Sequence, residues 1–219
     1  MKRRLVAPDG SCLFSSIDYL VSGEERDVAP VLRELCVTRY LASPDIYTID
    51  LLGEDKSSVA EYCEWIKSPH VYGGGNEIAI LSQELNVKIA VMSCIPFTTA
   101  CLLARYEPNA GSVGIIGTVY LLYNGQHYDA MVGEDDQRIF AGDAATDAEA
   151  LACARQIKED RELDLRTRVR KRLKCSCGAI CDTADAWQVH CNVHADDSDF
   201  DWLCEEITVN EVVATVTDD

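Results

Sequence analysis

The sequence predicts an α+β fold for about its first 140 residues. Helical periodicity dominates residues 12–85, and strand-like runs dominate residues 87–132. The composition, 47% hydrophobic and 26% charged, is ordinary for a globular protein. A chain of this composition is not disordered throughout.

Four helices are expected before most of the strands, from the spacing of their apolar residues. Gly23, Pro44 and Pro69 end the first three. Asn76 is expected to cap the fourth. The expected helices cover residues 12–21, 30–41, 57–66 and 77–85.

Three strands are expected next. Residues 87–92 and 118–123 are continuous apolar runs rich in β-branched and aromatic side chains. Asn124-Gly125 predicts a tight turn before the last strand, residues 127–132.

The chain changes character after these strands. Residues from Asp143 on have a helix-forming composition, and five of the eleven cysteines lie from Cys175 onward. The acidic end is expected to be solvated or to fold back on the basic part of the linker. The expected organisation is a folded domain over 1–142, a helical, partly basic linker over 143–172, a cysteine–histidine unit over 173–195 and an acidic tail over 196–219.

The charge and hydropathy of the chain exclude several classes of partner. The net charge of −17 opposes binding of nucleic acid and anionic lipid by the whole molecule. The longest uncharged run, 89–104, is broken by Pro96 and falls short of the ~20 apolar residues of a spanning helix. No signal-peptide core follows the basic start. We therefore expect no membrane partner, a cytoplasmic or nuclear location, and reduced thiols.

Cys12 is the candidate nucleophile. A Pro-Asp-Gly turn, residues 8–10, delivers it to the first turn of an apolar helix. Unpaired N–H groups and the positive end of the helix dipole favour a thiolate there, and the N–H groups of residues 9–12 can bind an oxyanion. The alternative is a buried cysteine that merely begins a helix.

His127 is the candidate general base because it begins a strand after a tight turn. Asp129, two residues on, lies on the same face of that strand and can orient the imidazole ring. His70 is the rival base, although no neighbouring residue in the sequence would orient it.

Three segments together resemble the OTU (ovarian tumour) deubiquitinating cysteine proteases. They are Asp9-Gly-Ser-Cys-Leu-Phe14, Tyr72-Gly-Gly-Gly-Asn-Glu-Ile-Ala-Ile-Leu81 and Tyr120-Leu-Leu-Tyr-Asn-Gly-Gln-His-Tyr-Asp129. The nearest branch carries a zinc finger after the protease domain. The resemblance implies a papain-like α+β fold over residues 1–142.

The resemblance implies a thiol-dependent hydrolase that cleaves the isopeptide bond at the carboxy-terminal glycine of ubiquitin. Cys12 would be the nucleophile and His127 the general base. Asp9 would be the acidic member of the cysteine loop; its spacing makes Asp129 the better orienter of His127, and both acids stay candidates.

The same resemblance implies where the ubiquitin tail would bind. Gly10 would let the backbone approach the substrate. Gly73 and Gly74 would form a wall without side chains beside the Gly-Gly tail, or simply a turn. Gln126 would line the channel to the nucleophile.

The implied partners are ubiquitin and polyubiquitin chains. In this branch a ubiquitin-like module at the N-terminus docks on a AAA segregase, valosin-containing protein, in ER-associated degradation. Only six residues precede Ala7 here, so we expect this chain to lack the module that makes that contact.

The carboxy-terminal unit follows the Cys2His2 zinc-finger pattern. The expected ligands of a structural zinc ion are Cys175, Cys177, His190 and His194, with Cys181 as the alternative thiolate. A unit this small has too little hydrophobic core to fold without a bound metal ion that cross-links it. If no metal binds, the cysteines instead fill the small core.

Two other functions compete with a deubiquitinase. A nucleic-acid-binding finger would explain the basic run 166–174, but the expected finger helix, 183–193, carries no Lys or Arg. An inactive or weakly active ubiquitin-binding adaptor would not need an intact Cys12, His127 and Asp129.

Overall fold

The computed structural model describes residues 1–52, 56–167, 170–175, 177, 180–181 and 204–209. The chain divides into two compact units, Met1–Glu159 and Asp160–Asp219. Within the described residues, no helix combines the length and the apolar character needed to cross a membrane.

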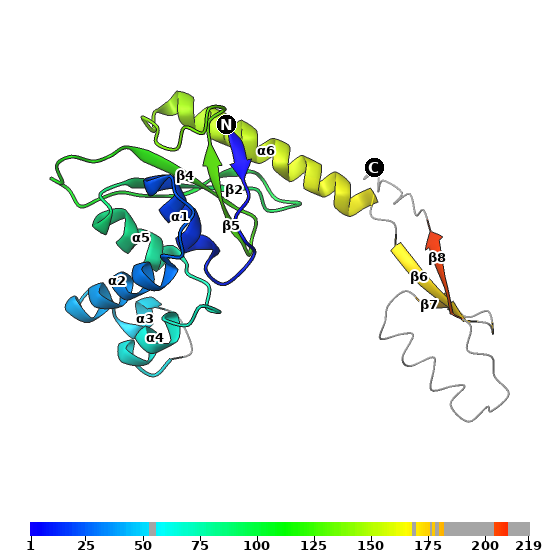
Figure 1. The fold of residues 1–219 in the computed structure, drawn as a ribbon, viewed down its shortest axis with the longest axis horizontal. Coiled ribbons are helices and arrows are strands. Elements are labelled where there is room, and N and C mark those ends of the chain that lie inside the picture. The colour runs from blue at the N-terminus through cyan, green and yellow to red at the C-terminus, as the bar shows by residue number, and fades with distance from the viewer. Residues whose placement is uncertain (53–55, 168–169, 176, 178–179, 182–203, 210–219) are drawn as a thin grey trace, which may run out of the picture. The chain divides into compact units, whose positions relative to one another are not determined.

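The first unit is built around a five-stranded sheet with the strand order β1-β5-β4-β2-β3 (Figure 1). The pair β2/β4 is parallel and every other pair is antiparallel. The strands are β1 Lys2–Arg4, β2 Lys88–Ser93, β3 Cys101–Tyr106, β4 Thr118–Tyr123 and β5 Tyr128–Val132.

Helices cover both faces of this sheet. Alternate residues of each central strand point to opposite sides, and the apolar residues on each side pack against helices. Ile89, Val91 and Leu121 belong to one core with the helices between β1 and β2. Ala90 and Met92 belong to a second core with the first half of α6, Ala144–Thr167. The helices of the first core are α1 Cys12–Ser22, α2 Ala29–Ala42, α3 Ile49–Leu52, α4 Val59–Ile66 and α5 Gly75–Glu84.

The helices and strands predicted for residues 12–132 are present, and their ends lie within one or two residues of the predicted positions. One predicted helix cap is corrected. Asn76 lies inside α5, and Gly74 is the N-cap. Glu77 explains the difference, because its buried carboxylate accepts the Gly74 N–H at 2.7 Å and so fixes the start of the helix two residues earlier.

Three elements of the first unit were not expected from the sequence: β1, α3 and β3. The two strands are the edges of the sheet, and their residues are mostly exposed or half-buried. Edge strands form through long-range pairing, such as Lys2 with Val132 and Ile89 with Tyr106, so their local patterns are weak.

The second unit contains a three-stranded antiparallel sheet with the order β7-β6-β8. Strand β6, Arg170–Cys175, begins inside the segment expected to be a helical linker, and β8, Cys204–Val209, lies inside the expected acidic tail. Lys174 pairs with Glu205 of β8 and with Ile180 of β7, Ile180–Cys181. The acidic segment thus folds back on the basic one.

Candidate active site

Cys12 is the first residue of α1 and its side chain is buried. The loop before it is a compact series of turns. The Asp9 N–H donates to the Ala7 carbonyl, and the Asp9 carboxylate accepts the Ser11 N–H at 2.8 Å. The Cys12 N–H reaches the Asp9 carbonyl at 3.3 Å. Asp9 therefore shapes the loop by bonding to its own neighbours.

His127 immediately precedes β5, where a turn held by Asn124 presents its ring. The Asn124 Oδ1 accepts the backbone N–H groups of both Gln126 and His127, at 3.1 and 3.0 Å. His127 Nε2 lies 3.1 Å from Oδ1 of Asp129. The Asp129 side chain is only 3% exposed, so this contact is shielded from water.

The Asp129 carboxylate has a partner on each side. Arg3 approaches Oδ2 through Nε and a terminal nitrogen, both at 2.7 Å, and the Val6 N–H donates to Oδ1 at 2.9 Å. These contacts fix the oxygen that faces His127. No local pattern in the sequence indicates this role of Arg3, because only the pairing of β1 with β5 brings the first residues of the chain to this carboxylate.

The residue that follows His127 also contacts Cys12. The backbone of Tyr128 is hydrogen-bonded to the Cys12 thiol, and Ser16, one turn along α1, donates to the Tyr128 carbonyl at 3.2 Å. The start of α1 and the start of β5 are thereby held together. The thiol, the imidazole and the carboxylate occupy one site.

Burial raises the pKa of the Cys12 thiol, and this effect outweighs the hydrogen bonds from the backbone of Tyr128 and Leu13. The carboxylates of Asp9 and Asp129 raise the pKa further. The expected thiolate at the helix N-terminus is therefore not favoured by the protein alone. The thiol therefore needs a base to remove its proton before it can attack a substrate.

Two of the four expected oxyanion donors are already engaged. The N–H groups of Asp9 and Ser11 bond within the loop. The Gly10 N–H has no acceptor in the described part of the chain, and the Cys12 N–H makes only the long bond to Asp9. Gly10 and Cys12 are the donors left for an oxyanion.

The glycine segment, residues 73–75, contains two candidate glycines with different surroundings. A Cβ on Gly73 would lie 2.8 Å from Leu13 and 2.9 Å from Phe14, so close packing against α1 explains this glycine. A Cβ on Gly74 would meet nothing nearer than the Glu77 carboxylate, at 3.9 Å, so this position borders open space.

Two further candidates lie at the surface. The Gln126 side chain is exposed, at the tip of the turn before His127. His70 is also exposed, and its ring makes no hydrogen bond within the described residues. Its lack of an orienting partner makes His70 a weaker base candidate than His127.

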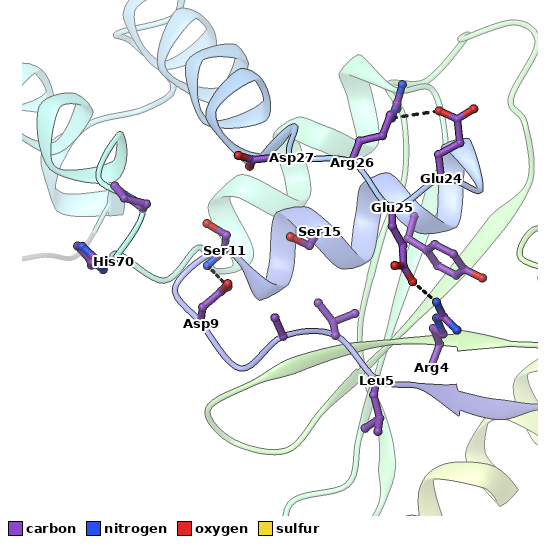
Figure 2. Close-up of a pocket in the computed structure, with 14 residues that line it drawn as sticks. Arg4, Leu5, Asp9, Ser11, Ser15, Glu24, Glu25, Arg26, Asp27 and His70 are labelled. Carbon is purple, nitrogen blue, oxygen red and sulfur yellow. Dashed lines mark hydrogen bonds and ion pairs between the residues drawn. The ribbon is translucent and has the colours of Figure 1, made fainter.

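A pocket of about 580 Å³ lies beside the cysteine loop (Figure 2). Asp9 and Ser11 line one end of it, and the ion pair between Arg4 and Glu25 lines the other. Cys12 itself does not line it. The pocket therefore adjoins the nucleophile without containing it.

Two of the four predicted zinc ligands fall outside the described residues. His190 and His194 lie there, whereas Cys175 ends β6 and the exposed Cys177 follows it in the β6–β7 connection. The hairpin register, Leu173 opposite Cys181, brings the chain segments of the candidate cysteines together. Within the described residues no cluster of three or more potential metal ligands occurs.

A helix-borne thiol beside a histidine–carboxylate pair is the arrangement found in papain-like cysteine proteases. The family model of the OTU-like cysteine proteases matches residues 7–128. The chain belongs to this family, and the papain-like α+β fold expected from the sequence is confirmed.

Similar proteins include two relatives called ubiquitin thioesterase OTU1. The one from Gallus gallus is 31% identical over 204 residues, which cover 89% of this chain and 63% of the relative. The one from Homo sapiens is 35% identical over 133 residues, which cover 60% and 35%. The chain thus spans less than two thirds of the length of these relatives.

Solved structures give the same family. A structure of an ovarian tumour (OTU) domain in complex with ubiquitin matches with a TM-score of 0.59 and 25% identity, over 73% of this chain and 88% of that chain. The viral OTU domain protease of Taggert virus matches with a TM-score of 0.50 and 18% identity, over 63% and 83%. The second likeness concerns the fold alone.

Proposed function

We propose that this protein is a deubiquitinase that hydrolyses the isopeptide bond at the carboxy-terminal glycine of ubiquitin. The observation that carries the proposal is the contact of Cys12 with the backbone of Tyr128, next to the His127–Asp129 pair. The relatives called ubiquitin thioesterase and the OTU domain bound to ubiquitin support ubiquitin as the substrate.

The reaction begins with transfer of the Cys12 proton to His127. The sulfur then attacks the carbonyl carbon of the terminal glycine, and the backbone N–H groups of Gly10 and Cys12 stabilise the oxyanion. Asp129 stabilises the imidazolium and keeps one ring nitrogen engaged, so the other faces the reacting groups.

Collapse of this intermediate releases the lysine amine of the substrate, which takes the proton back from His127. A water molecule, deprotonated by His127, then attacks the thioester. Ubiquitin leaves with a free carboxylate and Cys12 returns as a thiol. Gly74 and Gln126 are the proposed neighbours of the Gly-Gly tail, since both border open space beside the site.

The proposal is tested with a ubiquitin that carries an electrophile at its carboxy-terminus. The wild-type chain should form a covalent adduct at Cys12, located by peptide mass spectrometry. Cys12→Ala should form none and should cleave no ubiquitin chains, while still binding ubiquitin. Wild-type cleavage rates in Cys12→Ala would reject the assignment.

For the second unit we propose a Cys2His2-type zinc finger with ligands Cys175, Cys177, His190 and His194. The donor set of two thiolates and two imidazoles suits tetrahedral zinc, and the β6–β7 hairpin resembles the first half of such a finger. The ion would hold this small unit together and would take no part in catalysis.

We also propose a cytoplasmic or nuclear location, because the free thiol of Cys12 must stay reduced to act. Ubiquitin and its chains are the proposed partners. The AAA segregase complex stays a prediction from the family resemblance.

A further inference from the structure

Arg33 of α2 is a buried cation that joins the cysteine loop to the segment facing it. Its side chain is 1% exposed and lies over the Phe14 ring, 4.3 Å from the ring centroid. One terminal nitrogen donates to the Gly10 carbonyl at 2.8 Å and to the Val71 carbonyl at 2.7 Å; the other donates to the Ile66 carbonyl at 2.7 Å. One guanidinium thus holds three backbone carbonyls.

The contact that Arg33 joins is one of backbone against backbone. A Cβ on Gly10 would lie 2.4 Å from the Pro69 carbonyl oxygen and 2.6 Å from the carbonyl carbon of His70. The carbonyls of Ile66 and Val71, on either side of this pair, are the other acceptors of Arg33. The guanidinium therefore bonds both sides of the contact.

The Gly10–Ser11 peptide is held at both ends as a result. The Arg33 guanidinium donates to the carbonyl of this peptide, and the Asp9 carboxylate accepts its N–H. This peptide separates the two N–H groups proposed to bind the oxyanion, those of Gly10 and Cys12. A rotation of the peptide would move both donors relative to the sulfur.

The burial of Arg33 is costly, which a role in packing alone would not explain. Its Nε has no hydrogen-bond partner in the described structure, and desolvation lowers the pKa of the guanidinium. A buried cation commonly stabilises a fold no better than an apolar side chain of similar size. What an apolar residue cannot do is hold three carbonyls in a fixed geometry.

We propose that Arg33 is a positioning residue of the deubiquitinating reaction, which orients the oxyanion donors by holding the Gly10 carbonyl. The inference rests on the proposed function. It separates two properties of Cys12: the reaction of its thiolate with an alkylating agent, which Arg33 affects only through its charge, and the stabilisation of the tetrahedral intermediate, which depends on the held Gly10 carbonyl.

The test compares Arg33→Gln and Arg33→Lys with a control on the same helix, Arg39→Gln. Arg39 forms a surface ion pair with Glu84 at 3.2 Å. Each variant is assayed for turnover of a fluorogenic amide at the ubiquitin carboxy-terminus and for alkylation of Cys12 by chloroacetamide. Alkylation forms a thioether and expels chloride, so it generates no oxyanion.

Arg33→Gln should lower kcat by roughly 10–100-fold, somewhat less than the removal of a whole oxyanion donor. KM should stay within about threefold of wild type, since it does not depend on the oxyanion donors. The alkylation rate should do the same when it is measured above the pKa of the Cys12 thiol, where the loss of the nearby Arg33 charge no longer changes the thiolate fraction. Arg33→Lys keeps the charge but has one nitrogen for three carbonyls, so its kcat should lie between those of wild type and Arg33→Gln. The control should match wild type.

A folded Arg33→Gln with normal kcat would overturn the inference, as would an equal loss of turnover and alkylation. If both Arg33 variants fail to fold, Gly10→Ala decides, because it strains the same peptide and should lower kcat more than alkylation. An equal loss of both rates in Gly10→Ala, or no loss of kcat, also overturns the inference. A wild-type chain that alkylates but releases no fluorophore refutes the proposed function instead.

Discussion

Oδ1 of Asp129 accepts from His127 Nε2 at 3.1 Å, while the other oxygen of the same carboxylate is held by Arg3. The two carboxylates that the sequence left as alternatives therefore have different surroundings. Asp129 faces the imidazole, and Asp9 bonds to the Ser11 N–H in its own loop. Each arrangement predicts its own mutational phenotype.

Asp129→Ala should lower kcat by about 10²–10⁴, because His127 loses the group that orients its ring and stabilises its charged form. Steady-state hydrolysis of the fluorogenic ubiquitin amide measures this. Asp135→Ala is the control, because Asp135 is exposed in the turn after the same strand. Normal turnover in Asp129→Ala would remove it as the orienter.

Asp9 should reveal its role through the difference between two substitutions. Asp9→Asn keeps an oxygen that accepts the Ser11 N–H, so turnover should stay within about threefold of wild type. Asp9→Ala loses the acceptor and should cost roughly 10²–10³ in kcat through the disturbed loop. Equal losses in both would mean that the charge of Asp9, and not the turn, is what catalysis needs.

The state of Cys12 can be followed through pH. Burial and the two nearby carboxylates raise the pKa of the thiol, and the thiolate is the form that alkylates. The alkylation rate of Cys12 should therefore keep rising beyond neutral pH. In Asp9→Asn the rise should shift to lower pH, because a charge that raises the pKa is gone.

Mass spectrometry of the peptide that contains Cys12 separates this signal from the other ten cysteines. A rate that is already at its plateau below pH 7 would contradict the prediction. It would indicate a preformed thiolate–imidazolium pair.

The buried carboxylate of Glu77 should be a main source of stability near the glycine segment. It accepts the hydroxyls of Tyr40 and Tyr62 and the Gly74 N–H. Glu77→Ala leaves these donors buried without an acceptor, which should cost about 2–4 kcal/mol. Thermal unfolding measures the loss, with exposed Glu64→Ala as the control. A Tm equal to wild type would contradict this role.

Local sequence patterns predicted the helices, the central strands and the His127–Asp129 pair, because each depends on periodicity or on neighbouring residues. The partners of these groups were not predictable in the same way. Arg3 reaches Asp129 only through the pairing of β1 with β5, and the two residues are 126 positions apart in the chain. Arg33 reaches Gly10 only after α2 packs behind the cysteine loop. Such contacts are set by tertiary structure, and no local pattern encodes them.

The glycine segment shows the same limit within a short stretch. Gly73 and Gly74 look alike in the sequence, yet one is required by the close approach of Leu13 and Phe14 and the other borders open space. Only the position of α1 distinguishes them.

The proposed finger gives the last prediction. The purified chain should contain about one equivalent of zinc, and His190→Ala combined with His194→Ala should abolish its retention, since two thiolates alone leave the tetrahedral set incomplete. Removal of the ion by a chelator should unfold residues 173–195, because metal binding supplies the folding free energy of so small a unit.

Cleavage of the fluorogenic ubiquitin amide should persist after the zinc is removed, since Cys12, His127 and Asp129 all belong to the compact unit Met1–Glu159. Metal analysis, hydrogen exchange of the second unit and turnover with and without chelator make the test. Zinc far below one equivalent in wild type, or full retention in the double variant, would leave the cysteines as core residues of that unit; loss of cleavage on chelation would show that the second unit acts in catalysis.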